Sequence, residues 1–565
     1  MRVSGSAIAL WTGIWLVLLS GCTQWYARQA DKAATGAIQS ADRKALGTTQ
    51  PFDVTYRPFA RCGDPNNRTI QIGKKTIYLG TGPAQKLTPL EALEIAFRNS
   101  RGLQDKTEQL FSQALATSSG RQSWDYPMLG GEITADATHT KVNDGHEDNV
   151  GTVSPDLSLT QKLVNGGVFT FAYGLDVLTD FAGAGGTTVG SLLEANFTQP
   201  LLQGAWHGFA YEDQYRAERD LLLAVYEYYR FRQTFAADII TRYYRLLQQQ
   251  DLLTNQEKSI KRLDQTVIQT RVLVEGGQTS RIELDQAEQN RLNALIRLQR
   301  QRQDYHNQLD EFKITLGLPV AANVEGDYPE ALELLLQKGL DPMKLNEEEA
   351  VSAALSTRPD LLTQRSDLRD AGRDVEMAAD KFLPVLDVKL GFSAAGTKPR
   401  EFYRTRFDDH TRTVGASFEY PLNQTGNRDT YRNSLLESEK AKRGFSEFLD
   451  TVVLEVRRSC RELEQSRKSY ELQVRNVDLA RRRRTLAALQ QKEGQASARD
   501  VLEAEDALRE AQNGLTEAAV GYATTRLKFL AELGLIEVDE KGALHERDKP
   551  FGFEKLERLY PYLGR

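Results

Sequence analysis

Two very long stretches of the chain contain no proline, and this constrains the fold more than any other feature. The stretches are residues 201–318 and 422–549. Because a proline in a helix interior costs about 3 kcal/mol, such gaps indicate long helical regions. In both stretches apolar residues recur every three or four positions, which predicts the narrow seam of a coiled coil. Continuous helices over roughly 205–275 and 427–492 would each extend about 100 Å, too long for a compact domain.

The two helical regions belong to an internal duplication. The segment "GGQTSRIELDQAE" from Gly276 corresponds to "EGQASARDVLEAE" from Glu493, at a numbering offset of 217. Upstream, "LTPLEALEIAF" matches "LNEEEAVSAAL" at an offset of 258, and "FTQPLLQG" matches "FEYPLNQT" at an offset of 221. The changing offset means that the first half carries about 37 additional residues before its Pro-Leu pair and four more after it.

Each half also contains segments in which apolar and polar residues alternate, as in a strand with one apolar face. These segments are 386–392 and 414–420 in the second half, 169–177 and 189–197 in the first, and a less regular pair near 131–141 and 156–164. Alternation over about 10 residues suits a strand of a transmembrane barrel, although a soluble hairpin with one buried face has the same pattern. No run of about 20 apolar residues is present, so the sequence predicts no spanning helix.

The N-terminus has the layout of an export signal, with Arg2 followed by an apolar run from Ala7 to Leu19. The run ends in Leu-Ser-Gly-Cys22, which resembles the bacterial lipobox, whose cysteine is acylated and becomes the first mature residue. The alternatives are an ordinary signal peptide with a chance cysteine, or a short anchor helix. Since Thr23 rather than an aspartate follows, we expect lipidation at Cys22 and retention of the lipid in the outer membrane. Export and the anchor favour a membrane position for the alternating strands.

Four firmly predicted strands per chain cannot close a barrel, because closure needs about eight or more. An open sheet edge cannot sit in lipid either, because its backbone N–H and C=O groups would be unpaired. We therefore expect the chain to oligomerise. Three copies would supply twelve strands.

In their order, spacing and duplication, these motifs resemble the TolC-type outer-membrane factors, the exit ducts of tripartite efflux pumps and type I secretion systems. The resemblance covers roughly residues 85–536. It implies an α+β membrane protein, a homotrimer whose 12-stranded outer-membrane β-barrel continues into a long periplasmic α-helical barrel of coiled-coil pairs. The implied partners are outer-membrane lipid, a periplasmic adaptor (membrane fusion) protein and an inner-membrane efflux or ABC transporter. The alternative is a non-conducting, periplasm-spanning structural or tethering lipoprotein.

The predicted domains follow the duplication. They are a signal peptide with lipobox (1–22), an N-terminal linker or equatorial segment (23–86), repeat 1 (87–318, hairpin about 130–200, tip 275–281), an inter-repeat equatorial segment (319–344), repeat 2 (345–535, hairpin about 384–421, tip 493–499) and a C-terminal tail (536–565).

The family resemblance places a periplasmic gate and an adaptor-binding surface at the two inter-helix tips. The acids at gate positions are Asp500, Glu503 and Glu283, and their alternative role is that of solvated helix charges. The residues implied to contact the adaptor are Gly276, Gly277, Gln278, Thr279, Ser280, Gly494, Gln495, Ala496 and Ser497. Gln491 and Ala496 replace the family's latch residues, so Arg281 and Arg499 become the candidates for that role. The basic run "ARRRRTLA" (480–487) would face either an acidic partner or solvent.

Other functions find little support. The six histidines are scattered, and no H-E-x-x-H motif, Gly-rich phosphate loop or nucleophile elbow occurs. The sequence therefore predicts no enzyme, no metal site and no cofactor besides the lipid on Cys22. A net charge of −6 argues against a nucleic-acid partner. Cys460 is expected to be a spare buried thiol, while the role of Cys62 and the transported substrate stay open.

Overall fold

The chain forms two compact units in a computed structural model. The described residues are 23–46, 52–55, 69–72, 75–80, 82–141, 147–180, 188–328, 346–396, 410–493, 495–539 and 542–546. Unit 1 comprises Met1–Phe52, Leu110–Val225 and Leu362–Ser446, and unit 2 comprises Asp53–Gln109, Tyr226–Leu361 and Glu447–Arg565. Cys22, the predicted lipid site, and Cys62 lie outside the described residues.

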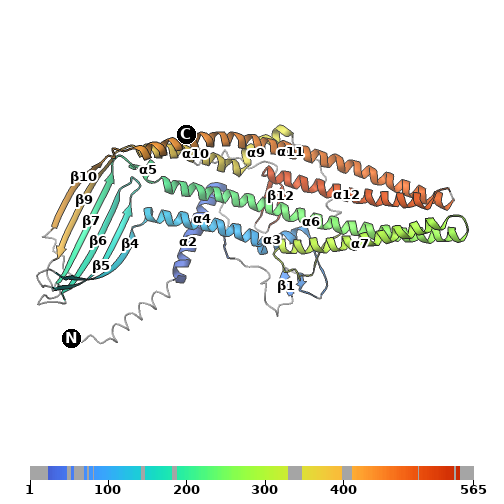
Figure 1. The fold of residues 1–565 in the computed structure, drawn as a ribbon, viewed down its shortest axis with the longest axis horizontal. Coiled ribbons are helices and arrows are strands. Elements are labelled where there is room, and N and C mark those ends of the chain that lie inside the picture. Colours follow the sequence, from blue (N-terminus) through green and yellow to red (C-terminus); the bar gives the residue numbers. More distant parts are fainter. Residues whose placement is uncertain are drawn as a thin grey trace, which may run out of the picture. The chain divides into compact units, whose positions relative to one another are not determined.

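Unit 1 contains one antiparallel sheet of six strands (Figure 1). In order across the sheet they are β10 (His410–Glu419), β9 (Val385–Gly396), β7 (Thr188–Pro200), β6 (Val168–Asp180), β5 (Glu147–Lys162) and β4 (Met128–Lys141). The shortest of them, β10, has 10 residues. A tilted strand of about 9–11 residues is long enough to cross a bilayer. The two halves of the sequence meet where β7 pairs with β9.

The predicted strand count needs a correction. All four firmly predicted strands are present, but the less regular pair also forms two full strands, β4 and β5. Their alternation is hard to recognise because Gly130 and Gly131 interrupt β4 and Pro155 interrupts β5. The count of four strands per chain is therefore corrected to six, and three copies hold eighteen such strands rather than twelve.

The register places most of the large apolar residues of the six strands on one face. Leu129 pairs with Leu159, which pairs with Phe171, and Phe171 pairs with Ala195. Paired residues share a face, so this series runs across the sheet and continues into β9. Other members of the apolar face are Ile133, Val153, Leu157, Phe169, Tyr173, Leu193, Phe197, Leu390, Val414 and Phe418.

Unit 1 also contains helices. These are α2 (Thr23–Leu46), α5 (His207–Ala210), most of α10 (Pro359–Asp380) and parts of α4 (Arg101–Asp125), α6 (Glu212–Glu275) and α11 (Thr425–Lys492). The sequence predicted an N-terminal linker or equatorial segment over 23–86, where α2 lies. The helical signal was present there, because the buried residues Ala34, Ile38, Ala41 and Ala45 recur at helical spacing.

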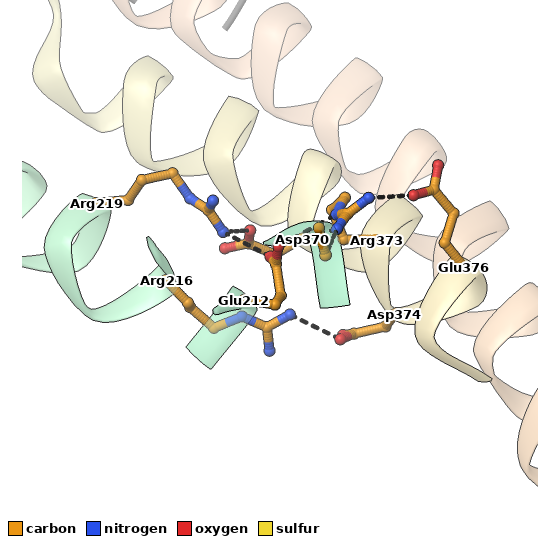
Figure 2. Close-up of polar contacts among 8 residues, drawn as sticks. Glu212, Arg216, Arg219, Asp370, Arg373, Asp374 and Glu376 are labelled. Carbon is orange, nitrogen blue, oxygen red and sulfur yellow. Dashed lines mark hydrogen bonds and ion pairs between the residues drawn. The ribbon is translucent and has the colours of Figure 1, made fainter. Parts of the chain in front are cut away.

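A cluster of ion pairs joins the start of α6 to α10 (Figure 2). The Glu212 carboxylate, 6% exposed, accepts hydrogen bonds from Arg219 at 3.4 Å and from Arg373 at 3.1 Å. The remaining pairs are Arg219–Asp370, Arg216–Asp374 and Arg373–Glu376. Because α6 follows β7 and α10 precedes β9, the cluster fixes both helices beside the strand pair that joins the two repeats.

Unit 2 holds the remaining helices, α3 (Pro89–Asn99), α7 (Arg281–Thr315), α9 (Glu347–Thr357) and α12 (Ala498–Glu532). Its short strands are β1 (Thr69–Ile72), β2 (Lys75–Tyr78), β3 (Gln85–Leu87), β8 (Val324–Gly326), β11 (Ile536–Val538) and β12 (Leu544–Glu546). The core surrounds the fully buried Tyr243, whose hydroxyl donates to the Leu87 carbonyl at 2.7 Å. Among the described residues, no helix is long and apolar enough to cross a bilayer. The half-buried Cys460 forms no disulfide, and burial raises the pKa of its thiol.

Unit 2 shows the duplication in its local structure. The helices α3 and α9 each have 11 residues and begin with a capping box, formed by Thr88 with Glu91 and by Asn346 with Glu349. The two boxes are related by the same offset of 258 that relates the matching sequences. The helices α7 and α12 each have 35 residues at the predicted offset of 217.

We expect Glu212→Gln to lower the free energy of unfolding by about 1–3 kcal/mol, because two partly buried guanidinium groups lose their shared carboxylate. The measurement is thermal unfolding of the purified protein in detergent. Glu376→Gln is the matched control, since its side chain is 59% exposed and exposed pairs contribute little. If both substitutions lower the free energy of unfolding equally, the burial of Glu212 does not make its ion pairs more stabilising.

Candidate functional site at the helical hairpin tips

Unit 2 presents two helical hairpins whose turns have related hydrogen bonds (Figure 1). The first connects α6 to α7 through residues 276–280, and the Gln278 N–H donates to the Leu273 carbonyl at 2.8 Å. The second connects α11 to α12, and the Gln495 N–H donates to the Gln490 carbonyl, also at 2.8 Å. The offset of 217 found in the sequence relates the two bonds. Gly277 has a φ of +70°, the left-handed conformation that glycine adopts most readily after a helix.

Asp500 lies in the first turn of α12, where it completes a capping box. The Ser497 N–H and hydroxyl both donate to Oδ2 of Asp500, at 2.9 and 2.7 Å. These two hydrogen bonds hold the pKa of the Asp500 carboxyl below its usual range. Asp500 is exposed and caps α12, an arrangement compatible with both roles that the sequence left open, a gate carboxylate and a solvated helix charge.

The other two predicted gate acids also have partners within the chain. Oε2 of Glu283, in α7, accepts a hydrogen bond from the Ala498 N–H at 3.3 Å, which connects the two tips. Glu503 forms an ion pair with Arg483 of α11 at 2.7 Å, and both side chains are exposed. The three acids therefore lie at the tips, but their environments differ.

The tip residues predicted to bind an adaptor lie in or beside the two turns. Ser280 and Ser497 are the N-caps of α7 and α12, and Arg281 and Arg499 are exposed in the first turns of those helices. Gly494 lies outside the described residues. Gln491 is 3% exposed and precedes the second turn by one residue of α11.

The most buried charge near the tips is a residue that the sequence did not predict. Glu505 of α12 is 1% exposed and accepts hydrogen bonds from Nε of Arg262, in α6, and Nε of Arg484, in α11, each at 2.5 Å. It follows Val501 by four residues and precedes Leu508 by three, so it occupies the apolar seam of its helix. This spacing to apolar residues is the signal in the sequence that indicates a buried position for Glu505.

The basic run is largely engaged within the chain. Arg482, Arg483 and Arg484 pair with Asp478, Glu503 and Glu505, respectively. In the described part of the chain, no group of three or more His, Cys, Asp or Glu side chains is arranged to hold a metal ion.

Comparison with protein families supports the interpretation of the fold. The sequence profile of the outer membrane efflux protein family matches residues 350–534, which is almost all of the second repeat. A search of curated protein sequences found no match.

Solved structures match over much more of the chain. The Campylobacter jejuni outer membrane channel CmeC is 16% identical with a TM-score of 0.57, covering 84% of this chain and 89% of its own. The Vibrio cholerae outer membrane protein VceC is 14% identical with a TM-score of 0.59, covering 79% and 96%. The open state of the Neisseria gonorrhoeae outer membrane channel MtrE is 13% identical with a TM-score of 0.56, covering 79% and 88%. At these identities the similarity establishes the fold.

An antiparallel sheet combined with two long helical hairpins gives the chain the fold of these outer membrane channels. Residues 350–534 match the outer membrane efflux protein family, and the chain shares the fold of solved outer membrane channels. The resemblance found in the sequence is therefore confirmed. The predicted location in the bacterial outer membrane is confirmed as that of the family, whereas the lipid on Cys22 stays a prediction.

We expect Glu505→Gln to destabilise the tips by about 3–5 kcal/mol, because two arginines lose a buried shared partner. The measurement is hydrogen exchange of the amides at the tip ends of α11 and α12. Glu288→Gln is the control: this residue is the counterpart of Glu505 in the first repeat but is 44% exposed in its pair with Arg271. Similar loss of protection in both variants would show that the burial of Glu505 has no special effect.

Proposed function

We propose that the chain is the outer-membrane exit duct of a tripartite efflux pump or type I secretion system and works as a homotrimer. The observation that carries the proposal is the continuous apolar face of the six-stranded sheet. Ile133, Val414 and Phe418 on this face are 74%, 79% and 68% exposed. An exposed apolar surface of this extent needs a cover, and strands of this length fit the hydrocarbon core of a bilayer.

Aromatic residues at the ends of the strands support the same position. Tyr126 lies two residues before the start of β4, Trp206 lies between β7 and α6, and Tyr420 directly follows β10, and all three are exposed. Each occurs at a junction between sheet and helix. Tyrosine and tryptophan concentrate where the hydrocarbon core meets water, so this row suits the periplasmic boundary of the membrane.

The tips are the proposed entrance. Three copies would bring six turns together, and the exposed Asp500 carboxylates would form a ring that attracts cations, with Glu503 and Glu283 beside it. In the same proposal, residues 276–280 and 494–497 bind a periplasmic adaptor, and Arg281 and Arg499 act as the latch. An inner-membrane efflux or ABC transporter would supply the substrate. The family's members are channels, and the duct requires neither a catalytic residue nor a cofactor besides the proposed lipid on Cys22.

The alternative is a tethering lipoprotein that spans the periplasm without conducting. It would use the same helices and the same lipid anchor. The polar face of the sheet favours the duct, because residues such as Glu194, Asn196 and Asp387 would line a water-filled barrel.

Recording in planar lipid bilayers tests the proposal. We expect the wild-type trimer to show a small, cation-selective conductance. The double substitution Asp500→Ala and Glu503→Ala should enlarge the conductance several-fold and weaken its selectivity, because the carboxylate ring is removed.

Glu510→Ala is the matched control, because Glu510 is an exposed acid of α12 almost two helical turns beyond Glu503. If both the double variant and the control conduct like the wild type, the gate lies elsewhere. Trimers that insert but never conduct, even as the double variant, would favour the tether.

A further inference from the structure

The β4–β5 hairpin is an insertion in the first repeat. The helix before the strands ends at Asp125 in repeat 1 and at Asp380 in repeat 2. In repeat 2 the next strand, β9, begins after four residues, whereas in repeat 1 the corresponding strand, β6, begins only at Val168. The intervening segment contains the β4–β5 hairpin, which accounts for the surplus of about 37 residues in the first half. Without it, each repeat would contribute one hairpin.

The inserted hairpin continues the pattern of the sheet on both faces. Leu129, Ile133 and Val153 lie on the apolar face, in register with the apolar residues of β6. On the opposite face β4 carries Glu132, Thr134 and Asp136, paired with Asp156, Ser154 and Thr152 of β5. A soluble hairpin with this division would bury its apolar face, whereas Leu129 and Ile133 are 71% and 74% exposed.

The register offset between neighbouring strands continues through the inserted hairpin. Met128, the first residue of β4, is in register with Thr413, six positions before the end of β10; the series runs through Thr160, Thr170, Asn196 and Gly391. From β4 to β10 the strands are thus offset by six residues of about 3.3 Å each, across five strand spacings of about 4.8 Å. This offset corresponds to strands tilted by about 40° from the barrel axis. Strands of outer-membrane barrels are tilted by about 35–45°.

The two outer edges fit each other. The edge strands β4 and β10 lie at opposite ends of the sheet order and have 14 and 10 residues. Because neighbours alternate in direction and the number of strands is even, β4 of one copy would run antiparallel to β10 of the next. A ring of copies is then antiparallel throughout and leaves no edge in the lipid.

We propose that the inserted hairpin belongs to the barrel wall, so that three copies close an eighteen-stranded barrel whose inner wall is acidic. This inference rests on the proposed trimeric channel and concerns its width and lining. Barrel diameter grows with strand number: at a strand spacing of about 4.8 Å and a tilt of about 40°, twelve strands give roughly 24 Å between opposite backbones and eighteen give roughly 36 Å. Barrels of 16–18 strands hold an aqueous channel.

The inner wall would favour positively charged cargo. Charged side chains on the polar face of the described strands are mostly carboxylates. They are Glu132, Asp136, Asp156, Asp176, Glu194, Asp387 and Glu419, against the cations Lys162 and Lys389. The inserted hairpin contributes three of these acids. A wide barrel with this lining suits bulky cationic or weakly charged cargo better than anionic cargo.

Cysteine reactivity in lipid nanodiscs tests the position of the hairpin. In a background carrying Cys62→Ala and Cys460→Ala, a single cysteine is introduced by Ile133→Cys or Thr134→Cys, and labelling by a water-soluble maleimide is timed. We expect Thr134→Cys to react at least tenfold faster, since residue 134 would face the water-filled lumen and residue 133 the lipid. Phe171→Cys and Thr170→Cys in β6 provide the matched reference pair.

The outcomes separate this inference from the proposed function. Equal reactivity at 133 and 134, with unequal reactivity at 170 and 171, places the hairpin outside the barrel and overturns the inference while the channel stands. Equal reactivity in both pairs overturns both. Cryo-electron microscopy of the wild-type protein in nanodiscs then counts the strands directly: eighteen, with β4 of one copy beside β10 of the next, supports the inference, and twelve overturns it.

Discussion

Backbone hydrogen bonding at the edges of the sheet is the constraint on which the rest of the proposed structure depends. Within one chain, β5, β6, β7 and β9 have a partner on each side, whereas β4 and β10 have one each. In water the free edges would be solvated, but in hydrocarbon each unpaired group costs several kcal/mol. In the proposed membrane position the apolar face contacts lipid, but the two free edges exclude a single chain from that position. Both demands are met only when copies of the chain pair edge to edge.

The duplication is also visible where α7 and α12, the helices that return from the tips, end. Both long return helices end at a glycine with positive φ, Gly317 and Gly534, and the following N–H bonds back to the last turn. A Cβ on Gly317 would overlap the carbonyl oxygen of Asn99, so no other residue fits there. The equivalent of Asn99 is Thr357, which instead donates its hydroxyl to the Leu533 carbonyl at 2.9 Å. The two repeats therefore have the same backbone arrangement at this helix end, stabilised by different side chains.

The sequence predicted those elements whose signal is local and periodic. The alternation at 169–177 corresponds to β6, and the helices on either side of each tip begin and end close to the predicted positions. The start of the first long helix was predicted near residue 205, but α6 begins at Glu212. Gly204 and Trp206 have positive φ values there, which break the chain between β7 and the helix. Trp206 gives no sign of this in the sequence, because tryptophan seldom adopts that conformation.

The inserted hairpin was harder to recognise for a related reason. Its strands contain glycine and proline, which are poor strand formers by local propensity. The neighbouring strand β6 supplies the pairing that makes β5 a strand, and a single-sequence pattern does not contain that information. The same limit applies to Glu505. Its position on an apolar seam was visible, but its two arginine partners come from α6 and α11, one of them 243 residues away.

The three tip acids differ in their environments, and these differences indicate which of them best suits the proposed gate. Glu503 forms an exposed ion pair with Arg483, and Glu283 accepts a hydrogen bond from the Ala498 amide. Asp500 uses only Oδ2 for its two hydrogen bonds from Ser497, and these bonds also lower its pKa, so its charge persists to lower pH than that of an ordinary carboxyl. A cap residue is moreover held in place by the helix it begins. A fixed, exposed and persistently charged carboxylate is what a selective ring requires, which makes Asp500 the strongest of the three candidates.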